Sequence, residues 1–415
     1  MGLDRRRDSA AHRGRDRRPT HRRRPVTHAI EQDSRLSQLA VDLNTDLVEG
    51  LETSGKLTAR AWRAAFEDVP RHLFAPRFTL PDNLGGMVLG IVDGTRPEEW
   101  LNAVYHDEAL LTIFDEREMV TTSCSAPSVV AIMLEYSQAA EGDTVLEIGT
   151  GTGWTAGLLS HRLGPDAVTS VDIDPRCVAE ARERLDRLGL DPTLAVADGY
   201  LGYPARAQYD RIIATASLRK VPPTWLTQIR PGGTILADLR GDFAGNLARL
   251  TVNKDRSANG RFLPQRVNFM PLRSKEEYLH ELPELASRAV SAPGPHRQTG
   301  LAPSALRTWD FAFLAQLSMP GARAGRVRVQ GGPMYYCLTD PQTESWARVD
   351  PDADDTEREV TQGGDRRLWD ELEAAYEHWI RLNQPQPADF TITVAPDGGQ
   401  AVTLPSTDKQ WSLSL

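Results

Sequence analysis

A glycine-rich turn followed by an acidic residue carries the clearest chemistry in this sequence. Residues 149–153 are GTGTG, just after Glu147, and Asp172 follows about twenty residues past the glycines. Glycine is required where a strand turns into a helix beside a ligand, because a side chain there would separate the backbone from the ligand. A carboxylate at the distance of Asp172 can accept hydrogen bonds from both ribose hydroxyls of an adenosine. The pattern therefore predicts a nucleoside-binding site.

The spacing of the glycines distinguishes two kinds of nucleotide ligand. A dinucleotide site usually keeps the spacing G-x-G-x-x-G, so that a pyrophosphate can rest on the start of the helix. Here the third glycine, Gly153, comes one residue earlier. The spacing therefore favours an adenosine ligand that has no phosphate. A glycine-rich turn can also be purely structural, but Asp172 at the expected distance argues against that interpretation.

The elements around this turn alternate between strands and helices. Apolar runs predict buried strands, and a helix-period segment from Trp154 to Leu163 joins the first two of them into a βαβ unit. Strands are expected at 145–148, 168–173, 194–198, 209–215 and 234–239, and two helices at 34–50 and 58–68 precede them. This order predicts an α/β domain with a doubly wound sheet.

Composition and charge exclude several classes of protein. The 415 residues have a net charge of −9, and their glycine, proline and charge content is that of an ordinary soluble globular protein long enough for two domains. An acidic body argues against a nucleic-acid-binding surface, because phosphate neutralisation supplies most of such affinity. No apolar run reaches the length of a membrane span and no secretory signal is evident, so no membrane contact is expected.

The three cysteines predict neither a metal site nor a disulfide framework. Cys124, Cys177 and Cys337 lie far apart in the sequence and form no C-x-x-C pair. We therefore expect no bound metal and a reducing, cytoplasmic location.

The arm at residues 1–33 is predicted to be disordered. It holds ten arginines against five acidic residues. Such an arm could capture an acidic partner, but a solvated tail or an overlong start to the reading frame is the favoured interpretation.

Motifs over about residues 45–273 resemble the protein-L-isoaspartate O-methyltransferase family. The sequence EIGTGTG is similar to motif I of the S-adenosylmethionine-dependent methyltransferases, so the resemblance implies a Rossmann-like class I methyltransferase fold. Other segments are similar to the family's motifs and stand in the family's order. They are VPRHLFAP at 69–76, YHDEALLT at 105–112, CSAP at 124–127, DG at 198–199, RPGG at 230–233 and a predicted strand, RVNFMPLR, at 266–273.

The resemblance also implies which residues hold the cofactor, S-adenosyl-L-methionine, and which face the acceptor. The expected cofactor residues are Glu147, Gly149, Thr150, Gly151, Gly153, Trp154, Asp172, Ile173, Asp198 and Gly199. Ser125 matches the serine of the family's I-S-x-P signature, which faces the methyl-accepting carboxylate, and Thr122 and Ser123 precede it in the same polar turn. Ser125 is also predicted to be the N-cap of a helix that has Pro127 in its first turn.

Two departures from the family pattern concern the acceptor pocket. Cys124 replaces the usual isoleucine, and Ser128-Val129 replaces the His-Met of many repair enzymes. These departures favour an acceptor other than that of the repair enzymes.

The chain beyond residue 273 is expected to have no counterpart in the isolated repair enzymes. Residues 274–305 are interpreted as a linker with one helix at 275–288. Residues 306–415 are predicted to form a smaller α+β domain that recognises a peptide, with a helix at 366–382 and strands that include WDFAFLAQL at 309–317. This architecture resembles that of actinobacterial paralogues encoded beside ribosomally made peptides of the lanthipeptide and graspetide or imiditide classes.

Three functions stay open from the sequence. The resemblance favours a carboxyl O-methyltransferase that methylates an aspartate side chain of a modified precursor peptide, leading through an aspartimide (succinimide) towards isoaspartate. The alternative is a protein-L-isoaspartate O-methyltransferase that repairs damaged proteins. A further alternative is a non-catalytic peptide-binding protein with a methyltransferase fold. The expected partner is a peptide or protein that bears Asp or isoAsp, and no oligomeric state is predicted.

The predicted reaction needs little from catalytic side chains. An aspartate carboxylate has a pKa of about 3.9, so it is already a nucleophile at neutral pH and needs no general base. Its attack on a sulfonium methyl is an in-line displacement, which positioning and exclusion of water accelerate. No constellation of His, Lys or metal ligands is therefore expected.

Overall fold

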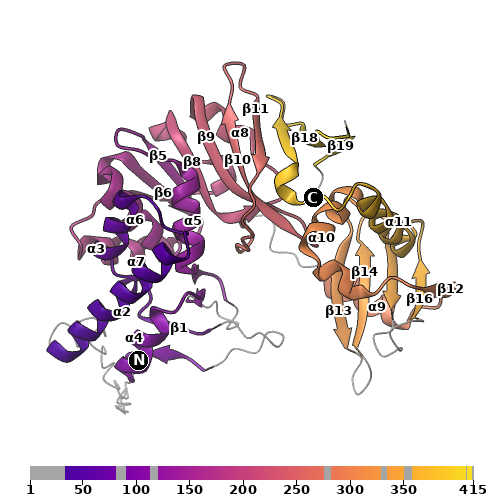
Figure 1. The fold of residues 1–415 in the computed structure, drawn as a ribbon, viewed down its shortest axis with the longest axis horizontal. Helices are drawn as coiled ribbons and strands as arrows, with labels where there is room; N and C mark the ends of the chain where they lie inside the picture. The colour runs from indigo at the N-terminus through magenta and orange to yellow at the C-terminus, as the bar shows by residue number, and fades with distance from the viewer. Residues whose placement is uncertain are drawn as a thin grey trace, which may run out of the picture.

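Two sheets organise the computed structural model, which describes residues 33–80, 90–112, 120–274, 282–328, 334–349, 358–407 and 409–413. A mixed sheet of ten strands forms the larger part, and an antiparallel sheet of five strands lies in a smaller lobe beside it (Figure 1). No helix within these ranges is long and apolar enough to cross a membrane. Within the same ranges the three cysteines are free, and no three potential metal ligands gather.

The parallel half of the large sheet confirms the predicted α/β order. Five strands pair in parallel in the order β9-β8-β5-β6-β7. They are β5 (Val145–Ile148), β6 (Val168–Asp172), β7 (Thr193–Val196), β8 (Tyr209–Leu218) and β9 (Ile229–Arg240). The helices between and beside them are α5 (Pro127–Ser137), α6 (Trp154–Leu163), α7 (Pro175–Asp186) and α8 (Pro223–Gln228). Every residue of β5 and β6 is buried, which explains why these strands are apolar runs without alternation.

Helices precede the sheet, as predicted. The two expected helices are α2 (Ser34–Thr53) and α3 (Arg60–Asp68), and α4 (Pro97–Val104) follows them. Phe66 of α3 lies edge-on to Trp154 of α6, with 5.4 Å between the ring centroids, so the N-terminal helices pack directly on the βαβ unit. Short antiparallel pairs connect these helices: β1 (Arg77–Phe78) with β2 (Val92–Asp93), and β3 (Leu110–Leu111) with β4 (Ser123–Cys124).

The antiparallel half of the large sheet contains the end of the chain. β10 (Gly245–Val252) and β11 (Ala258–Phe262) continue from β9, and β17 (Thr391–Val394), β18 (Gln400–Leu404) and β19 (Lys409–Ser412) extend the sheet from β11. This pairing corrects the predicted single domain at 306–415, because its last part belongs to the large sheet. The local pattern identifies a strand near β17 but carries no information about its distant pairing partner.

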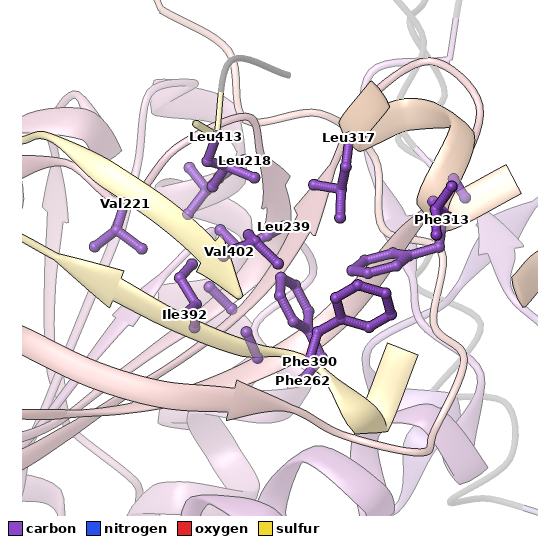
Figure 2. Close-up of a cluster of buried hydrophobic side chains, with 14 of the residues drawn as sticks. Leu218, Val221, Leu239, Phe262, Phe313, Leu317, Phe390, Ile392, Val402 and Leu413 are labelled. Carbon is purple, nitrogen blue, oxygen red and sulfur yellow. The ribbon is translucent and has the colours of Figure 1, made fainter. Parts of the chain in front are cut away.

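An aromatic cluster holds this C-terminal segment onto the large sheet (Figure 2). The ring centroid of Phe390 lies 5.3 Å from that of Phe313, which lies 4.8 Å from that of Phe262, and all three side chains are buried. Gln400 of β18 adds a buried polar contact, because its side-chain amide accepts from Val221 N and donates to Val221 O. A chain that ended before β17 would expose this apolar cluster to water.

The small lobe, residues 282–381, is an antiparallel sheet with helices on both faces. Its strands, in spatial order, are β12 (His296–Thr299), β16 (Arg358–Gly363), β15 (Ser345–Val349), β14 (Met334–Asp340) and β13 (Arg323–Arg328). Cys337 of β14 packs in a cluster with α9 (Leu282–Ser291), and its neighbour Leu338 packs in a cluster with α11 (Leu368–Arg381). Successive strand residues point to opposite faces, so α9 and α11 cover opposite sides of the sheet.

Two predictions for this lobe are wrong, and one is confirmed. Residues 309–317 form helix α10 (Trp309–Ser318) and not a strand. Residues 311–317 are all buried, so this short run has no exposed polar face by which periodicity could distinguish a helix from a strand. Residues 282–299, within the predicted linker, form α9 and β12 and complete the lobe. The predicted helix at 366–382 is confirmed as α11. Residues 1–32 of the predicted arm and the start of the helix expected at 275–288 lie outside the described residues.

Replacing Phe390 by alanine should lower the free energy of unfolding by about 3–5 kcal/mol, because it leaves a cavity where β17 joins β11. Chemical unfolding followed by fluorescence would measure this loss. Val41→Ala, on the exposed face of α2, is the control and should change the free energy by less than about 0.5 kcal/mol. A loss at Phe390 no larger than that of the control would show that the C-terminal strands contribute little to stability.

Candidate active site

A pocket lies at the carboxyl ends of the parallel strands, beside the glycine turn. This is the edge at which open α/β sheets bind ligands. Four segments line the pocket: residues 121–125, 149–152, 171–173 and 270–273. The lining is completed by Trp154, Thr155, Gly199, Thr215 and Ala216.

The glycine turn is shaped by close packing on both sides. Gly149 and Gly153 have φ angles of 99° and 90°, in the left-handed region that favours glycine. A Cβ on Gly149 would lie 2.7 Å from Thr215 Oγ1, and a Cβ on Gly153 would lie 2.7 Å from Ala181 Cβ. The turn therefore needs glycine so that β8 and α7 can pack against it, in addition to any approach of a ligand.

Several backbone N–H groups of the turn are bonded within the protein. Gly149 N and Thr150 N donate to Val171 O at 2.8 and 3.1 Å, and Gly151 N donates to Asp172 Oδ2 at 2.9 Å. A pyrophosphate would need N–H groups that point towards it. These three groups are therefore not available to a pyrophosphate, as the glycine spacing predicts.

Asp172 closes the turn and also lines the pocket. Its Oδ2 accepts the hydrogen bond from Gly151 N, and its Oδ1 accepts one from Asp174 N at 3.0 Å. Burial raises the pKa of the Asp172 carboxyl, and these hydrogen bonds together with the charge of Arg273 act against that rise. Each carboxylate oxygen has a further lone pair, so the side chain can still accept hydrogen bonds from a pair of ribose hydroxyls.

Glu147 lies behind the turn and does not line the pocket. It is fully buried; Ser170 Oγ donates to its Oε2 at 2.5 Å and lies 2.7 Å from Thr150 Oγ1. Burial raises the pKa of Glu147 to about 8, so the side chain is protonated at neutral pH. The structure therefore does not bring Glu147 to the predicted cofactor contact; it supports Thr150, which does line the pocket.

A second, mainly apolar hollow adjoins the pocket at Ile173, which lines both. Asp198 lines this hollow, and its Oδ1 accepts from Tyr200 N at 2.9 Å at the start of the short helix η3 (Gly199–Leu201). Gly199 lines the first pocket. The predicted residues Ile173, Asp198 and Gly199 are thus brought together where the two hollows meet.

The three residues predicted to face the acceptor all line the pocket. Thr122 is buried, and its Oγ1 lies 3.2 Å from Cys177 Sγ. Ser123 and Ser125 are partly exposed. Ser123 and Ser125 are therefore the more accessible residues of the three, whereas Thr122 contacts the protein interior.

Ser125 is not the N-cap of α5, contrary to the prediction. The helix begins at Pro127, and its N-cap, Ala126, makes no side-chain hydrogen bond. Asp107, from a distant segment, takes that role, because its Oδ1 accepts from Ser128 N at 2.8 Å. The positive end of the helix dipole is therefore already matched by a carboxylate, and the Ser125 hydroxyl has no capping role.

A buried arginine, Arg71, positions the polar turn. Its side chain is fully buried, and the guanidinium carbon lies 5.4 Å from the ring centroid of Trp154. The guanidinium donates to the backbone carbonyls of Val104, His106, Glu108, Cys124 and Ser125, at 2.5, 3.0, 2.7, 3.1 and 2.8 Å respectively. The sequence analysis missed this role, and the only signal for it was the place of Arg71 within a family motif.

The segment 266–273 contributes its last four residues, 270–273, to a wall of the pocket, and the sequence did not predict a place for it in the site. It is not the regular strand that was predicted. Ser217 N donates to the Met270 carbonyl at 2.9 Å, and Leu272 N donates to the Ser217 carbonyl at 2.8 Å, which together make an isolated bridge. Met270, Leu272 and Arg273 line the pocket, so this segment adds an apolar surface and a positive charge.

Arg71→Met should lower the free energy of unfolding by about 3 kcal/mol or more, because each buried carbonyl left without a donor costs about 1–3 kcal/mol. Arg71→Lys should recover only part of this loss, because an ammonium cannot reproduce the planar fork of donors. Thermal unfolding would measure both variants. The control is Arg35→Met, whose exposed side chain should matter little. An Arg71→Met protein as stable as the parent would contradict the positioning role.

Comparisons with known proteins identify the family to which this chain belongs. A model of the family described as Protein-L-isoaspartate(D-aspartate) O-methyltransferase matches residues 94–277. The protein-L-isoaspartate O-methyltransferase of Ignicoccus hospitalis is 33% identical over 193 residues, which cover 46% of this chain and 79% of that protein. Protein-L-isoaspartate O-methyltransferase 2 of Archaeoglobus fulgidus is 32% identical over 232 residues, which cover 55% of this chain and 92% of that protein.

A solved structure extends the likeness of fold beyond the catalytic half. It is a protein-L-isoaspartate O-methyltransferase with a TM-score of 0.50 and 21% identity, and the match covers 87% of this chain and 99% of that chain. A match of this extent includes part of the chain beyond residue 273, so the C-terminal region does have a structural counterpart, contrary to expectation. The family model and the sequence relatives show that this chain belongs to the protein-L-isoaspartate O-methyltransferase family and is an S-adenosylmethionine-dependent O-methyltransferase.

Proposed function

We propose that this chain methylates the free carboxylate of an isoaspartyl residue in a peptide or protein. The observation that carries the proposal is a single pocket lined both by the glycine turn with Asp172 and by the partly exposed residues Ser123 and Ser125. A cofactor side suited to an adenosine and a polar acceptor side are the two parts that such a transfer requires.

The residues of the pocket fit S-adenosylmethionine. Asp172 would accept hydrogen bonds from the ribose, and Ile173 and Asp198 would lie along the nucleoside where the two hollows meet. The bonded N–H groups of the turn suit a ligand without phosphate. When bound, this cofactor supplies a methyl group on a sulfonium that a carboxylate oxygen can attack.

The protein's task on the acceptor side is orientation. Among the described residues that line the pocket there is neither a His nor a Lys that could act as a general base. An ionised carboxylate needs none. The hydroxyls of Ser123 and Ser125 would donate to one oxygen of the acceptor and leave the other free to attack, while buried Trp154 and Cys124 exclude water from the site.

A second candidate is methylation of an ordinary aspartate in a ribosomally made, modified precursor peptide. The departures from the family signature favour it. Cys124 lines the pocket and is smaller than the usual isoleucine, so it leaves more room beside Ser125. The product ester would lose methanol as the next backbone nitrogen attacks, giving an aspartimide. The C-terminal region does not favour this candidate over the first, because a protein-L-isoaspartate O-methyltransferase of known structure matches part of that region.

Asp172→Ala should weaken the binding of S-adenosylhomocysteine by about tenfold to a hundredfold, because it removes a charged acceptor from the site. Titration calorimetry would measure the affinity. Asp191→Ala, at an exposed ion pair with Arg182, is the control and should bind like the parent. Equal affinities for Asp172→Ala and the parent, or binding of NAD in place of the sulfonium cofactor, would show that the cofactor site is wrongly assigned.

The acceptor should be revealed by mass spectrometry after incubation with cofactor and peptide. A generic isoaspartyl peptide should gain the mass of one methylene and then lose methanol as the succinimide forms. Ser125→Ala should slow this methylation strongly while changing the thermal midpoint only slightly, since Ser125 caps no helix.

A cyclised precursor peptide with a normal aspartate provides the comparison. Methylation of that peptide alone would favour the second candidate. An isoaspartyl peptide that stays unmodified while the cofactor binds would overturn the first candidate and leave the cofactor site intact.

A further inference from the structure

Two arginines of the large-sheet part contact the ring of one tryptophan of the small lobe. Trp309 is the first residue of α10, which lies at the junction between the large sheet and the lobe (Figure 1). The guanidinium carbons of Arg240 and Arg266 lie 5.4 and 5.8 Å from the centroid of its ring. The indole N–H donates to Asn246 Oδ1 at 3.2 Å, and Arg266 pairs with Asp310 at 3.3 Å. Charged and polar groups of the large-sheet part therefore hold the start of α10.

Arg240 is bonded in turn to the segment that leads into the cofactor pocket. Its Nη2 donates to the carbonyl of Val267, and its Nε donates to Asp238 Oδ2 at 3.0 Å. Asp238 is fully buried, and the same oxygen accepts from Phe269 N at 3.2 Å. Charge-assisted hydrogen bonds of this kind are among the stronger ones in proteins. Trp309 is thus connected, through Arg240 and Asp238, to the backbone just before the pocket wall.

The segment 266–273 packs Val267, Phe269 and Leu272 against the hydrophobic core, but its backbone forms no regular ladder. It belongs to no named strand, and its backbone meets the large sheet at the bridge to Ser217. The Tyr200 hydroxyl donates to the Leu272 carbonyl at 3.3 Å. The groups that hold Val267 and Phe269 therefore add to the bridge at Ser217 in setting the position of residues 270–273.

We propose that Asp238, Arg240 and Trp309 are positioning residues that make cofactor affinity depend on the docking of the small lobe. This inference rests on the proposed assignment of the pocket to S-adenosylmethionine. The docked ring of Trp309 holds Arg240 over the buried carboxylate of Asp238, and the two side chains together fix the backbone that continues into the pocket wall. Removal of the ring frees Arg240 to turn towards solvent and loosens that wall, without touching the cofactor itself.

The test compares tryptophan variants of the full chain by their affinity for S-adenosylhomocysteine. Trp309→Leu should weaken binding about five- to thirtyfold, the range expected for a partly desolvated cation–π contact. Trp309→Phe keeps an aromatic face and should restore most of the affinity. Hydrogen exchange should become faster in peptides that cover residues 266–273 of Trp309→Leu, because the wall has lost its support.

Trp411→Leu is the matched control. Trp411 is also partly buried against the same hydrophobic core, but it packs on Phe390 of the C-terminal segment, away from the wall. This variant should bind the cofactor product like the parent and leave exchange at 266–273 unchanged. Equal losses of affinity in both leucine variants would show a general effect of stability and would overturn the inference.

Arg240→Gln alone should weaken binding to a similar degree, and this variant tests the route even if Trp309→Leu folds poorly. In a double-mutant cycle, adding Trp309→Leu to Arg240→Gln should cost little more, because the effect of the ring passes through Arg240. Fully additive losses, or an Arg240→Gln protein that binds like the parent, would overturn the route. A parent protein that itself bound no S-adenosylhomocysteine would instead refute the cofactor site, which separates the two failures.

Discussion

The buried charge of Arg71 is the constraint on which the acceptor side of the pocket depends. A guanidinium taken out of water costs several kcal/mol unless its donors are satisfied. Here carbonyls of two segments, 104–108 and 124–125, and the ring face of Trp154 replace that water. This arrangement requires the N-terminal helices, the polar turn and the start of α6 to come together in one way. The hydrogen bonds that satisfy the buried guanidinium of Arg71 therefore also set the backbone position of Ser125.

The small lobe is an insertion into the large sheet, since the chain leaves after β11 and returns at β17, which pairs with β11. The lobe contacts the large sheet at two places, the aromatic cluster around Phe390 and the contact of Trp309 with Arg240 and Arg266. A lobe that packs against the large sheet at two places is not an independent domain on a flexible linker. Its docking is part of the fold of the catalytic half, and it reaches the pocket through the segment 266–273.

In the proposed function the pocket acts by excluding water and orienting the acceptor. The two acids near the glycine turn differ in place: Asp172 lines the pocket and closes the turn, whereas Glu147 is buried behind the turn, where burial favours its protonated form. The proposed acceptor carries its own charge, so the protein would only need to supply hydroxyls that orient it and apolar walls that keep water out. Such a site is compatible with either an isoaspartyl or an aspartyl carboxylate, and the fit around Ser125 decides between them.

The sequence by itself determined the α/β order, the glycine turn with Asp172, the polar turn and the family. Each of these depends on the types and spacing of residues that are close together in the sequence. Other features depend on contacts between distant parts of the chain, so only the tertiary structure determined them. They are the pairing of β17 with β11, the helical state of residues 309–317, the capping of α5 by Asp107 and the buried contacts of Arg71. The same holds for Glu147, whose motif predicted a ligand contact but whose side chain is buried behind the turn. In each case the deciding partner lies far along the chain, and only the folded packing shows which group satisfies a buried charge, a free strand edge or a helix end.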